Sequence, residues 1–408
     1  MSVTAADAAS CTLHDAGTCR SCPHLSLPMP NQLAAKQSRV AALLAEHVPA
    51  ELWQAPAASA PTGFRNKAKM AVAGTAAHPT LGILDGAGCG VDLRTCPLHV
   101  PAIEAALPVL ADLVTELGLR PYDVPTRRGE LKYILVTASP DDDLMVRFVL
   151  RSRRYLERLR AAVPDLHRRL PQLAVAAVNI QSVHQAVIEG PEEIVLTDED
   201  RLLMRLSLPS PDGGGQAGRL AASVELPLYL PTRSFFQTNT AVAEALYATA
   251  RDWAEETEPA RVWDLFCGVG GFALALAAPG RRVLGVEVSA SAIDGARAAA
   301  DLMGLDPALV RFEAGDARVL DPAAGERAGG VQRPDLLVVN PPRRGIGEQL
   351  ATRIEASGVE RVLYSSCNPR TLAADLAHLP SMRVVRSRLF DMFPHTEHAE
   401  VLVELVRD

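Results

Sequence analysis

Long apolar runs, a secretory leader and internal repeats are all missing from this 408-residue sequence. A membrane-spanning helix needs roughly 18 or more consecutive apolar residues, and no window supplies them. Residues 1–10 carry neither the basic start nor the apolar centre of a secretory signal. No segment recurs at the period of about 20 to 50 residues that marks repeat proteins. We therefore expect a cytoplasmic protein that crosses no membrane and is not a solenoid.

The sequence also lacks a cysteine framework suited to disulfides, since its seven cysteines are odd in number and widely scattered. Metal ligation and catalysis are the roles that this usage favours. The composition, 48% hydrophobic and 22% charged, is that of a soluble globular protein. Because single hydrophobic cores stop growing at about 250 to 300 residues, the length predicts more than one domain.

The net charge of −7 argues against a protein that coats nucleic acid without specificity. Cations are nevertheless concentrated locally. Between Arg120 and Arg169 the chain carries twelve arginines and lysines against seven acidic residues, and residues 64–69 (FRNKAK) add three cations beside an aromatic ring. Contact with a polyanion and an ordinary solvated surface both explain these segments.

Four segments with different patterns divide the chain. Residues 1–28 hold three cysteines in a loop-rich stretch, and residues 29–55 contain a helix that we expect to pack on the C-terminal domain. Residues 56–230 show short apolar runs broken by Pro, Gly and Asp, which predicts a β-rich central domain. In residues 231–408 strands alternate with helices, so we predict an α/β fold with a doubly wound, mostly parallel, Rossmann-like sheet.

A glycine turn at residues 264–271 (DLFCGVGG) leads from the first of these strands into a helix. Glu287 ends the next strand, where its carboxylate can accept hydrogen bonds from two ribose hydroxyls. Together they predict a nucleoside-containing cofactor at the carboxyl ends of the strands. Gly268, Gly270 and Gly271 do not give the Gly-x-Gly-x-x-Gly spacing of a dinucleotide site, which favours S-adenosylmethionine (SAM) over NAD.

Three polar or nucleophilic residues stand at later strand ends. Asn340 opens the sequence Asn-Pro-Pro-Arg after one strand, and Cys367 follows the next, where a thiolate can attack carbon. The last strand, residues 399–406, lies close enough in the chain to its predecessor to form an antiparallel pair. Because an antiparallel strand begins at the edge where parallel strands finish, Glu400 is predicted to lie in the same cleft as a potential base.

These motifs resemble those of the RNA uracil-C5 methyltransferase family over nearly the whole chain. The resemblance is carried by residues 234–239 (SFFQTN), 264–268 (DLFCG), 340–343 (NPPR), 365–368 (SSCN) and 393–396 (FPHT), followed by Glu400. Within the family, the sequence is most similar to the branch that methylates uracil 747 of bacterial 23S ribosomal RNA. This similarity is carried by the N-terminal cysteines and by residues 63–70 (GFRNKAKM) and 128–134 (RGELKYI).

The resemblance implies a Rossmann-like SAM-dependent methyltransferase domain that methylates carbon 5 of a uracil. Carbon 5 is too weak a nucleophile to take the methyl group directly. The implied mechanism therefore has Cys367 add to carbon 6, and Glu400 later remove the carbon 5 proton as general base. By match of position, the residues that bind the cofactor or its surroundings are Gln237, Phe266, Glu287 and Asn340, the last of which stands where many relatives carry Asp.

The family also carries a [4Fe-4S] cluster on four cysteines, and this pattern is matched by Cys11, Cys19, Cys22 and Cys96. Residues 1–28 would then be an iron–sulfur segment whose fourth ligand comes from the central domain. Four thiolates suit zinc as well, so the ligand set alone leaves both metals open. Cys89 is the rival fourth ligand, and Cys96 matches the family's position better.

The partner that the resemblance implies is 23S ribosomal RNA, bound by the β-rich central domain. It implies no contact with DNA or a membrane and no obligate protein partner. Two alternatives stay open: the same reaction on transfer RNA, and a cluster-bearing RNA-binding protein without turnover. The presence of both Cys367 and Glu400 argues against the second.

Overall fold

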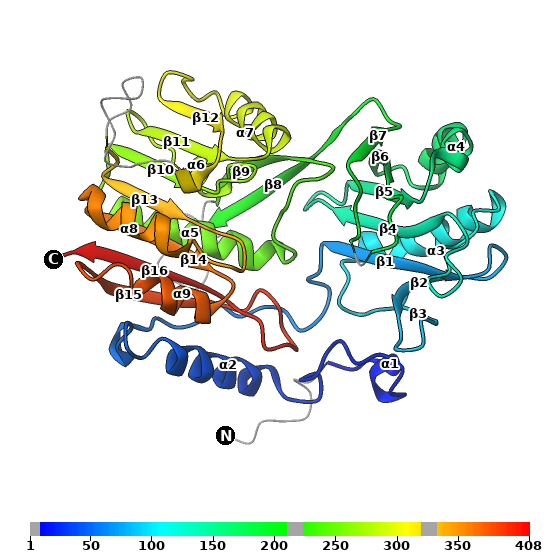
Figure 1. Ribbon diagram of the computed structural model, residues 1–408, viewed down its shortest axis with the longest axis horizontal. Coiled ribbons are helices and arrows are strands. Elements are labelled where there is room, and N and C mark those ends of the chain that lie inside the picture. The colour runs from blue at the N-terminus through cyan, green and yellow to red at the C-terminus, as the bar shows by residue number, and fades with distance from the viewer. Residues whose placement is uncertain (1–8, 186, 210–222, 320–332) are drawn as a thin grey trace.

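The computed structural model describes residues 9–185, 187–209, 223–319 and 333–408. The described residues form two large sheets, which lie side by side in Figure 1, and a separate hairpin. The N-terminal helices α1 (Thr12–Asp15) and α2 (Met29–Leu43) run below the sheets in that view, and η2 (Ala50–Leu52) follows them. Within these ranges, no helix combines the length and the apolar character that crossing a membrane requires.

The first sheet is formed by the middle of the chain. Its strands, in their order across the sheet, are β3 (Gly90–Asp92), β2 (Pro79–Leu84), β1 (Lys67–Gly74), β4 (Leu131–Ala138), β5 (Leu144–Leu150), β6 (Leu173–Ile180) and β7 (Glu192–Val195). All neighbours are antiparallel except β5 and β6. One core joins this sheet to α3 (Pro101–Glu116), η3 (Arg153–Tyr155) and α4 (Leu156–Arg169). Strands therefore dominate the middle of the chain, as expected, and form a mixed sheet.

The second sheet is formed by the C-terminal part of the chain. Its strands, in order, are β12 (Val310–Ala314), β11 (Arg282–Glu287), β10 (Arg261–Leu265), β13 (Leu336–Val339), β14 (Arg361–Ser366), β16 (Glu400–Arg407) and β15 (Met382–Phe390). The strands from β12 to β14 are parallel, whereas β16 is antiparallel to both β14 and β15. The predicted mostly parallel α/β sheet is confirmed.

Helices cover both faces of this second sheet, which explains why its central strands are unbroken apolar runs. On β13, Leu336 and Val338 belong to one buried core, and Leu337 and Val339 belong to another. The helices of the first core are α5 (Thr240–Glu255), α6 (Gly271–Ala275) and α7 (Ala290–Leu302), and those of the second are α2, α8 (Gly347–Ser357) and α9 (Pro369–Leu376), with η5 (Ala317–Val319). The sheet is therefore doubly wound.

Two further segments pack against the second sheet and its helices. The hairpin of β8 (Arg201–Pro209) and β9 (Ser223–Pro231) lies against α5 and α7. Residues 53–57 form isolated bridges with Ser387 and Phe390 of β15. Residues 53–57 therefore cover the edge strand β15, which protects the unpaired backbone groups of that strand.

Candidate active site

Five of the residues predicted to be functional lie where the parallel strands of the second sheet end. Phe266 follows β10, Glu287 ends β11, and Asn340 follows β13. Cys367 follows β14, and Glu400 opens β16, which is antiparallel to β14. The carboxyl ends of the parallel strands and the start of the antiparallel strand therefore meet, at the place where sheets of this kind bind ligands.

The turn after β10 adopts left-handed backbone conformations. Phe266 has φ 67°, Gly268 has φ 55° and Gly270 has φ 87°. The backbone N–H groups of Phe266 and Cys267 donate to the Val286 carbonyl of β11 at 3.0 and 3.1 Å, which fixes the turn against the next strand. A left-handed conformation at a non-glycine residue such as Phe266 costs roughly 1 kcal/mol or more and is typical of functional turns.

Asp264, at the start of the turn motif, is fully buried. Its Oδ2 accepts a hydrogen bond from the Ala273 backbone N–H at 2.9 Å, whereas its Oδ1 has no hydrogen-bond partner among the described residues. Burial, together with the charge of Glu287, raises the pKa of Asp264 to about 8, although the hydrogen bond from the Ala273 N–H lowers it. A buried oxygen without a partner is costly. Beside a glycine turn, it fits a site that receives a polar ligand such as SAM.

Two other predicted cofactor residues, Glu287 and Gln237, lie at the end of β11 and just before α5. Glu287 accepts a hydrogen bond from the Ser289 backbone N–H at 3.0 Å through Oε1. Gln237 is buried just before α5, and its backbone carbonyl accepts a hydrogen bond from Asn66 Nδ2 at 3.0 Å, which joins this segment to the residue before β1. Cys267 is also buried, and burial raises the pKa of its thiol well above the ordinary value. Cys267 belongs to the buried core beside the turn, and burial disfavours its thiolate form.

Glu400 belongs to a buried polar group. Its Oε1 accepts hydrogen bonds from Ser365 Oγ at 2.5 Å and from Asn340 Nδ2 at 3.2 Å. The same Asn340 nitrogen donates to the Ser365 carbonyl at 3.3 Å. Burial raises the pKa of Glu400 to about 7, although the two hydrogen bonds to its carboxylate oppose the shift. The carboxyl group is therefore able to take up and release a proton near neutral pH.

Cys367 is half-buried at the edge of a cavity of about 300 Å³. The other residues that line this cavity are Arg39, Val40, Leu43, Arg343, Asn368, Pro369, Arg370, Glu397, His398 and Ala399. Burial and the charge of Glu400 raise the pKa of the Cys367 thiol, whereas Arg343 lowers it. Burial therefore disfavours the thiolate form of Cys367 in the protein alone, and Arg343 is the neighbouring group that favours it.

The N-terminal cysteines lie close to Cys96. Cys19 and Cys96 pack against the core of the first sheet. Burial raises the pKa of Cys22 to about 11, with added effects from the charges of Cys96, Cys19 and Cys11. Cys89 is exposed and is not among the charges that act on Cys22. In the part of the chain that the structure describes, no group of three or more His, Cys, Asp or Glu residues is placed to hold a metal ion.

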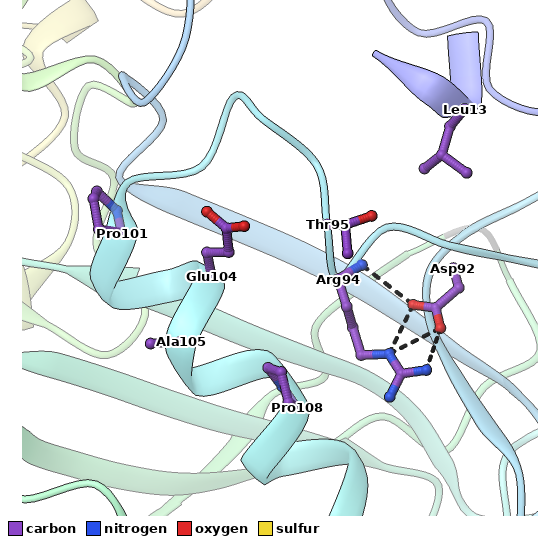
Figure 2. A pocket seen from close by; sticks show the side chains of 8 residues that line it. All are labelled: Leu13, Asp92, Arg94, Thr95, Pro101, Glu104, Ala105 and Pro108. Carbon is purple, nitrogen blue, oxygen red and sulfur yellow. Dashed lines mark hydrogen bonds and ion pairs between the residues drawn. The ribbon is translucent and has the colours of Figure 1, made fainter. Parts of the chain in front are cut away.

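A cavity of about 670 Å³ lies beside the N-terminal segment, and Figure 2 shows the residues that line it. It lies between Leu13 of α1, the end of β3 with Asp92 and the following Arg94, and the first turns of α3. Arg94 Nη2 forms an ion pair with Asp92 Oδ2 at 2.5 Å. Asp92 and Arg94 therefore satisfy each other, and the cavity brings no nucleophile together with a buried base.

Half of the cations between Arg120 and Arg169 are engaged in ion pairs within the protein. They are Arg147, Arg151, Arg153, Arg160, Arg168 and Arg169. Arg147 is almost fully buried, with Glu189 at 3.2 Å and Glu193 at 2.7 Å. These acids lie outside the stretch, so counting its charges overstated the cationic surface that it offers to a polyanion.

Known proteins of similar sequence carry names that fit this geometry. A family model described as tRNA (uracil-5-)-methyltransferase matches residues 228–408. The 23S rRNA (uracil(747)-C(5))-methyltransferase RlmC of Halothiobacillus neapolitanus is 48% identical over 97% of this chain and 99% of its own length. Proteins of the same name from Cronobacter sakazakii and Escherichia coli K12 are 46% and 44% identical, over 98% and 97% of this chain and 100% and 99% of their own lengths. The chain belongs to the RNA uracil-C5 methyltransferase family.

A solved structure supports the same fold. The Pyrococcus abyssi tRNA (uracil-54, C5)-methyltransferase in complex with S-adenosyl-L-homocysteine superposes with a TM-score of 0.74, over 94% of this chain and 85% of that chain. At 23% sequence identity, this likeness establishes the fold alone. The family resemblance and the SAM-dependent methyltransferase fold predicted from the motifs are confirmed.

Two residues that hold Glu400 or the loop leading into it were not singled out from the sequence. Ser365 lies two positions before Cys367 within a motif that was already recognised, so its nearness to the site was open to inference. Lys36 is different, because its buried partner Asp391 lies 355 positions away. No local pattern reveals a pair of that kind.

Proposed function

We propose that this chain methylates carbon 5 of uracil 747 in bacterial 23S ribosomal RNA, with SAM as the methyl donor. The observation that carries the proposal is the presence of Cys367 and Glu400 at the sheet edge that also holds the glycine turn. Relatives that are 44% to 48% identical are named for this reaction. Action on ribosomal RNA would place the protein in the cytoplasm. Loss of 5-methyluridine at position 747 from cells without this chain tests the proposal.

The proposed reaction passes through a covalent bond to the base. The Cys367 thiolate adds to carbon 6 of uracil, and the electrons displaced from the ring double bond make carbon 5 nucleophilic. SAM supplies the methyl group as an electrophilic sulfonium carbon. Glu400 then removes the remaining carbon 5 proton, the bond between carbon 6 and sulfur breaks, and Cys367 leaves as a thiolate while the double bond re-forms.

The residues proposed to hold SAM or to border it are Gln237, Phe266, Glu287 and Asn340. Glu287 ends β11, where a carboxylate can accept both ribose hydroxyls. Asp264, whose Oδ1 has no hydrogen-bond partner among the described residues, joins this set. The Asn340 amide cannot take up a proton at neutral pH, so its hydrogen bond to Glu400 orients the base and leaves proton removal to the carboxylate.

The RNA is proposed to approach over the cavity at Cys367. A target uracil inside folded RNA must be extruded before carbon 6 reaches the thiol, which costs a few kcal/mol. Phosphate contacts offset that cost. Arg343 and Arg370 line the cavity on an exposed surface, which makes them better placed for such contacts than the ion-paired arginines of the central domain.

The rate of product release from the adduct is expected to depend on pH through Glu400. Its active form is the carboxylate, and its pKa is raised to about 7. Release should therefore slow about tenfold for each pH unit below about 7 and level off above it. Quenched-flow measurement of adduct decay across this range checks the expectation, and the inflection should vanish in Glu400→Gln. Decay that is independent of pH below 7 would exclude Glu400 as the base.

We also propose that Cys11, Cys19, Cys22 and Cys96 hold a [4Fe-4S] cluster. Four thiolates are the donor set that such a cluster takes, and the charges of the other three act on Cys22. Arg65 lowers the pKa values of Cys22 and Cys96, against the effect of burial. A nearby cation favours an anionic group at this place.

Iron analysis distinguishes this cluster from zinc. Anaerobically purified protein is expected to contain about four irons and four sulfides per chain. Cys19→Ser and Cys96→Ser should lose the iron and the brown colour, whereas the matched change Cys89→Ser should keep both, because Cys89 is exposed and outside the group. Stoichiometric zinc without iron, in protein made with an active cluster-assembly system, would refute the assignment.

A further inference from the structure

The segment 391–399 connects β15 to β16 and leads directly into Glu400. Its Asp391, Met392 and His395 are at most 1% exposed. His395 has φ 63°, a left-handed conformation that non-glycine residues keep only where their surroundings impose it. The loop that approaches the proposed base is therefore held by its neighbours.

Helix α2 provides those neighbours through polar side chains on its buried face. Its buried residues are Gln32, Lys36 and Val40, spaced four apart. Lys36 Nζ donates to Asp391 Oδ1 at 2.5 Å and to the Phe393 carbonyl at 3.0 Å, and the side chains of Lys36 and Asp391 are at most 3% exposed. Burying a charged pair carries a desolvation cost that apolar side chains avoid. A helix that served only to pack would not need this pair.

The contact extends along the loop on both sides of this pair. The His395 backbone N–H donates to Gln32 Oε1 at 2.9 Å. Arg39 Nε pairs with Glu397 Oε2 at 2.7 Å, and the His24 backbone N–H donates to the His395 carbonyl at 3.1 Å. Residues 24–39 therefore contact loop 391–399 at successive positions.

We propose that Lys36 is a positioning residue for the last step of the reaction. By holding Asp391 it fixes loop 391–399, so that the Glu400 carboxylate faces the carbon 5 proton of the covalent adduct. Cys367 lies after a different strand, β14, although Glu397, His398 and Ala399 of the loop line the cavity beside it. Because the loop runs directly into Glu400, loss of the Lys36 contact should impair proton removal more than the earlier attack and methyl transfer. This inference rests on the proposed function.

The full-length variants Lys36→Met and Asp391→Asn test the inference, with Arg281→Met as a matched control. Arg281 is 5% exposed and pairs with Glu255 at 2.9 Å, and it precedes β11 at the opposite edge of the sheet from the site. In Lys36→Met we expect turnover to fall about 100-fold, as for a misplaced catalytic group. Methylated covalent RNA adduct should accumulate, and amide hydrogen exchange should quicken in residues 391–399.

Asp391→Asn keeps the shape of the side chain and should also accumulate adduct. Arg281→Met should lose thermal stability without accumulating adduct. Unchanged amide hydrogen exchange in residues 391–399 of Lys36→Met would overturn the inference. It would also be overturned if Lys36→Met lost turnover only in proportion to its loss of thermal stability and formed no adduct. A wild-type protein that methylates no uracil in 23S ribosomal RNA would contradict the proposed function, and the exchange measurement would still decide whether Lys36 holds the loop.

Discussion

The Cys367→Ala variant is expected to lose methylation by about 10³-fold or more, the scale on which removal of a catalytic nucleophile acts. Without the thiol, no adduct forms at carbon 6 and carbon 5 stays unreactive. SAM affinity should be unchanged, because the glycine turn and Glu287 lie on β10 and β11, away from the strand that Cys367 follows. Single-turnover methyl transfer to a 23S ribosomal RNA fragment, together with calorimetric titration of SAM, measures both quantities.

Cys89→Ala is the control for this variant, because Cys89 is also a free thiol but is exposed just before β3 of the first sheet. Its methylation rate should match that of the unmodified chain. A Cys367→Ala protein that still methylates RNA, or that loses SAM affinity to the same degree as activity, would reassign Cys367 to a structural role.

The Glu400→Gln variant is expected to stop after methyl transfer and to trap RNA on the protein. Attack by Cys367 and transfer of the methyl group both precede removal of the carbon 5 proton. An amide cannot accept that proton, so turnover should fall by about 10² to 10⁴, the usual contribution of a general base. Denaturing gels and intact-mass measurement should show a protein–RNA adduct that carries the added methyl group.

Glu348→Gln serves as the control for this change, since Glu348 is an exposed carboxylate in the first turn of α8. It should turn over normally and leave no adduct. The double change Cys367→Ala with Glu400→Gln should also leave none, because the bond to carbon 6 needs the thiol. Loss of single-turnover methyl transfer in Glu400→Gln, with no adduct, would assign the base to another residue.

The placement of the candidate site could be predicted because it depends on local patterns. Alternating strands and helices fix where the parallel strands end, and an antiparallel last strand has to begin at that same edge. This reasoning located Cys367, Asn340 and Glu400 together, and the structure has all three there. Their chemical roles, and the domain boundaries read from the sequence, stay predictions.

Long-range polar contacts could not be predicted. The Lys36–Asp391 pair joins positions 355 apart, and a single lysine in an expected helix gives no sign of its partner. The same limit affected the cation-rich stretch. Arg147 was counted among its cations, but its guanidinium forms ion pairs with Glu189 and Glu193, which lie further along the chain. Hydrophobic periodicity indicates which face of a helix or strand is buried, but it does not indicate which charged side chains pair at that face.

The most direct test of the central claim is to map 5-methyluridine in 23S ribosomal RNA and in transfer RNA from cells that lack this chain. The account predicts that the modification disappears at position 747 alone, the position for which the relatives are named. It should return with the unmodified chain and not with Cys367→Ala. A 23S modification that persists at position 747, or a loss confined to transfer RNA, would contradict the account.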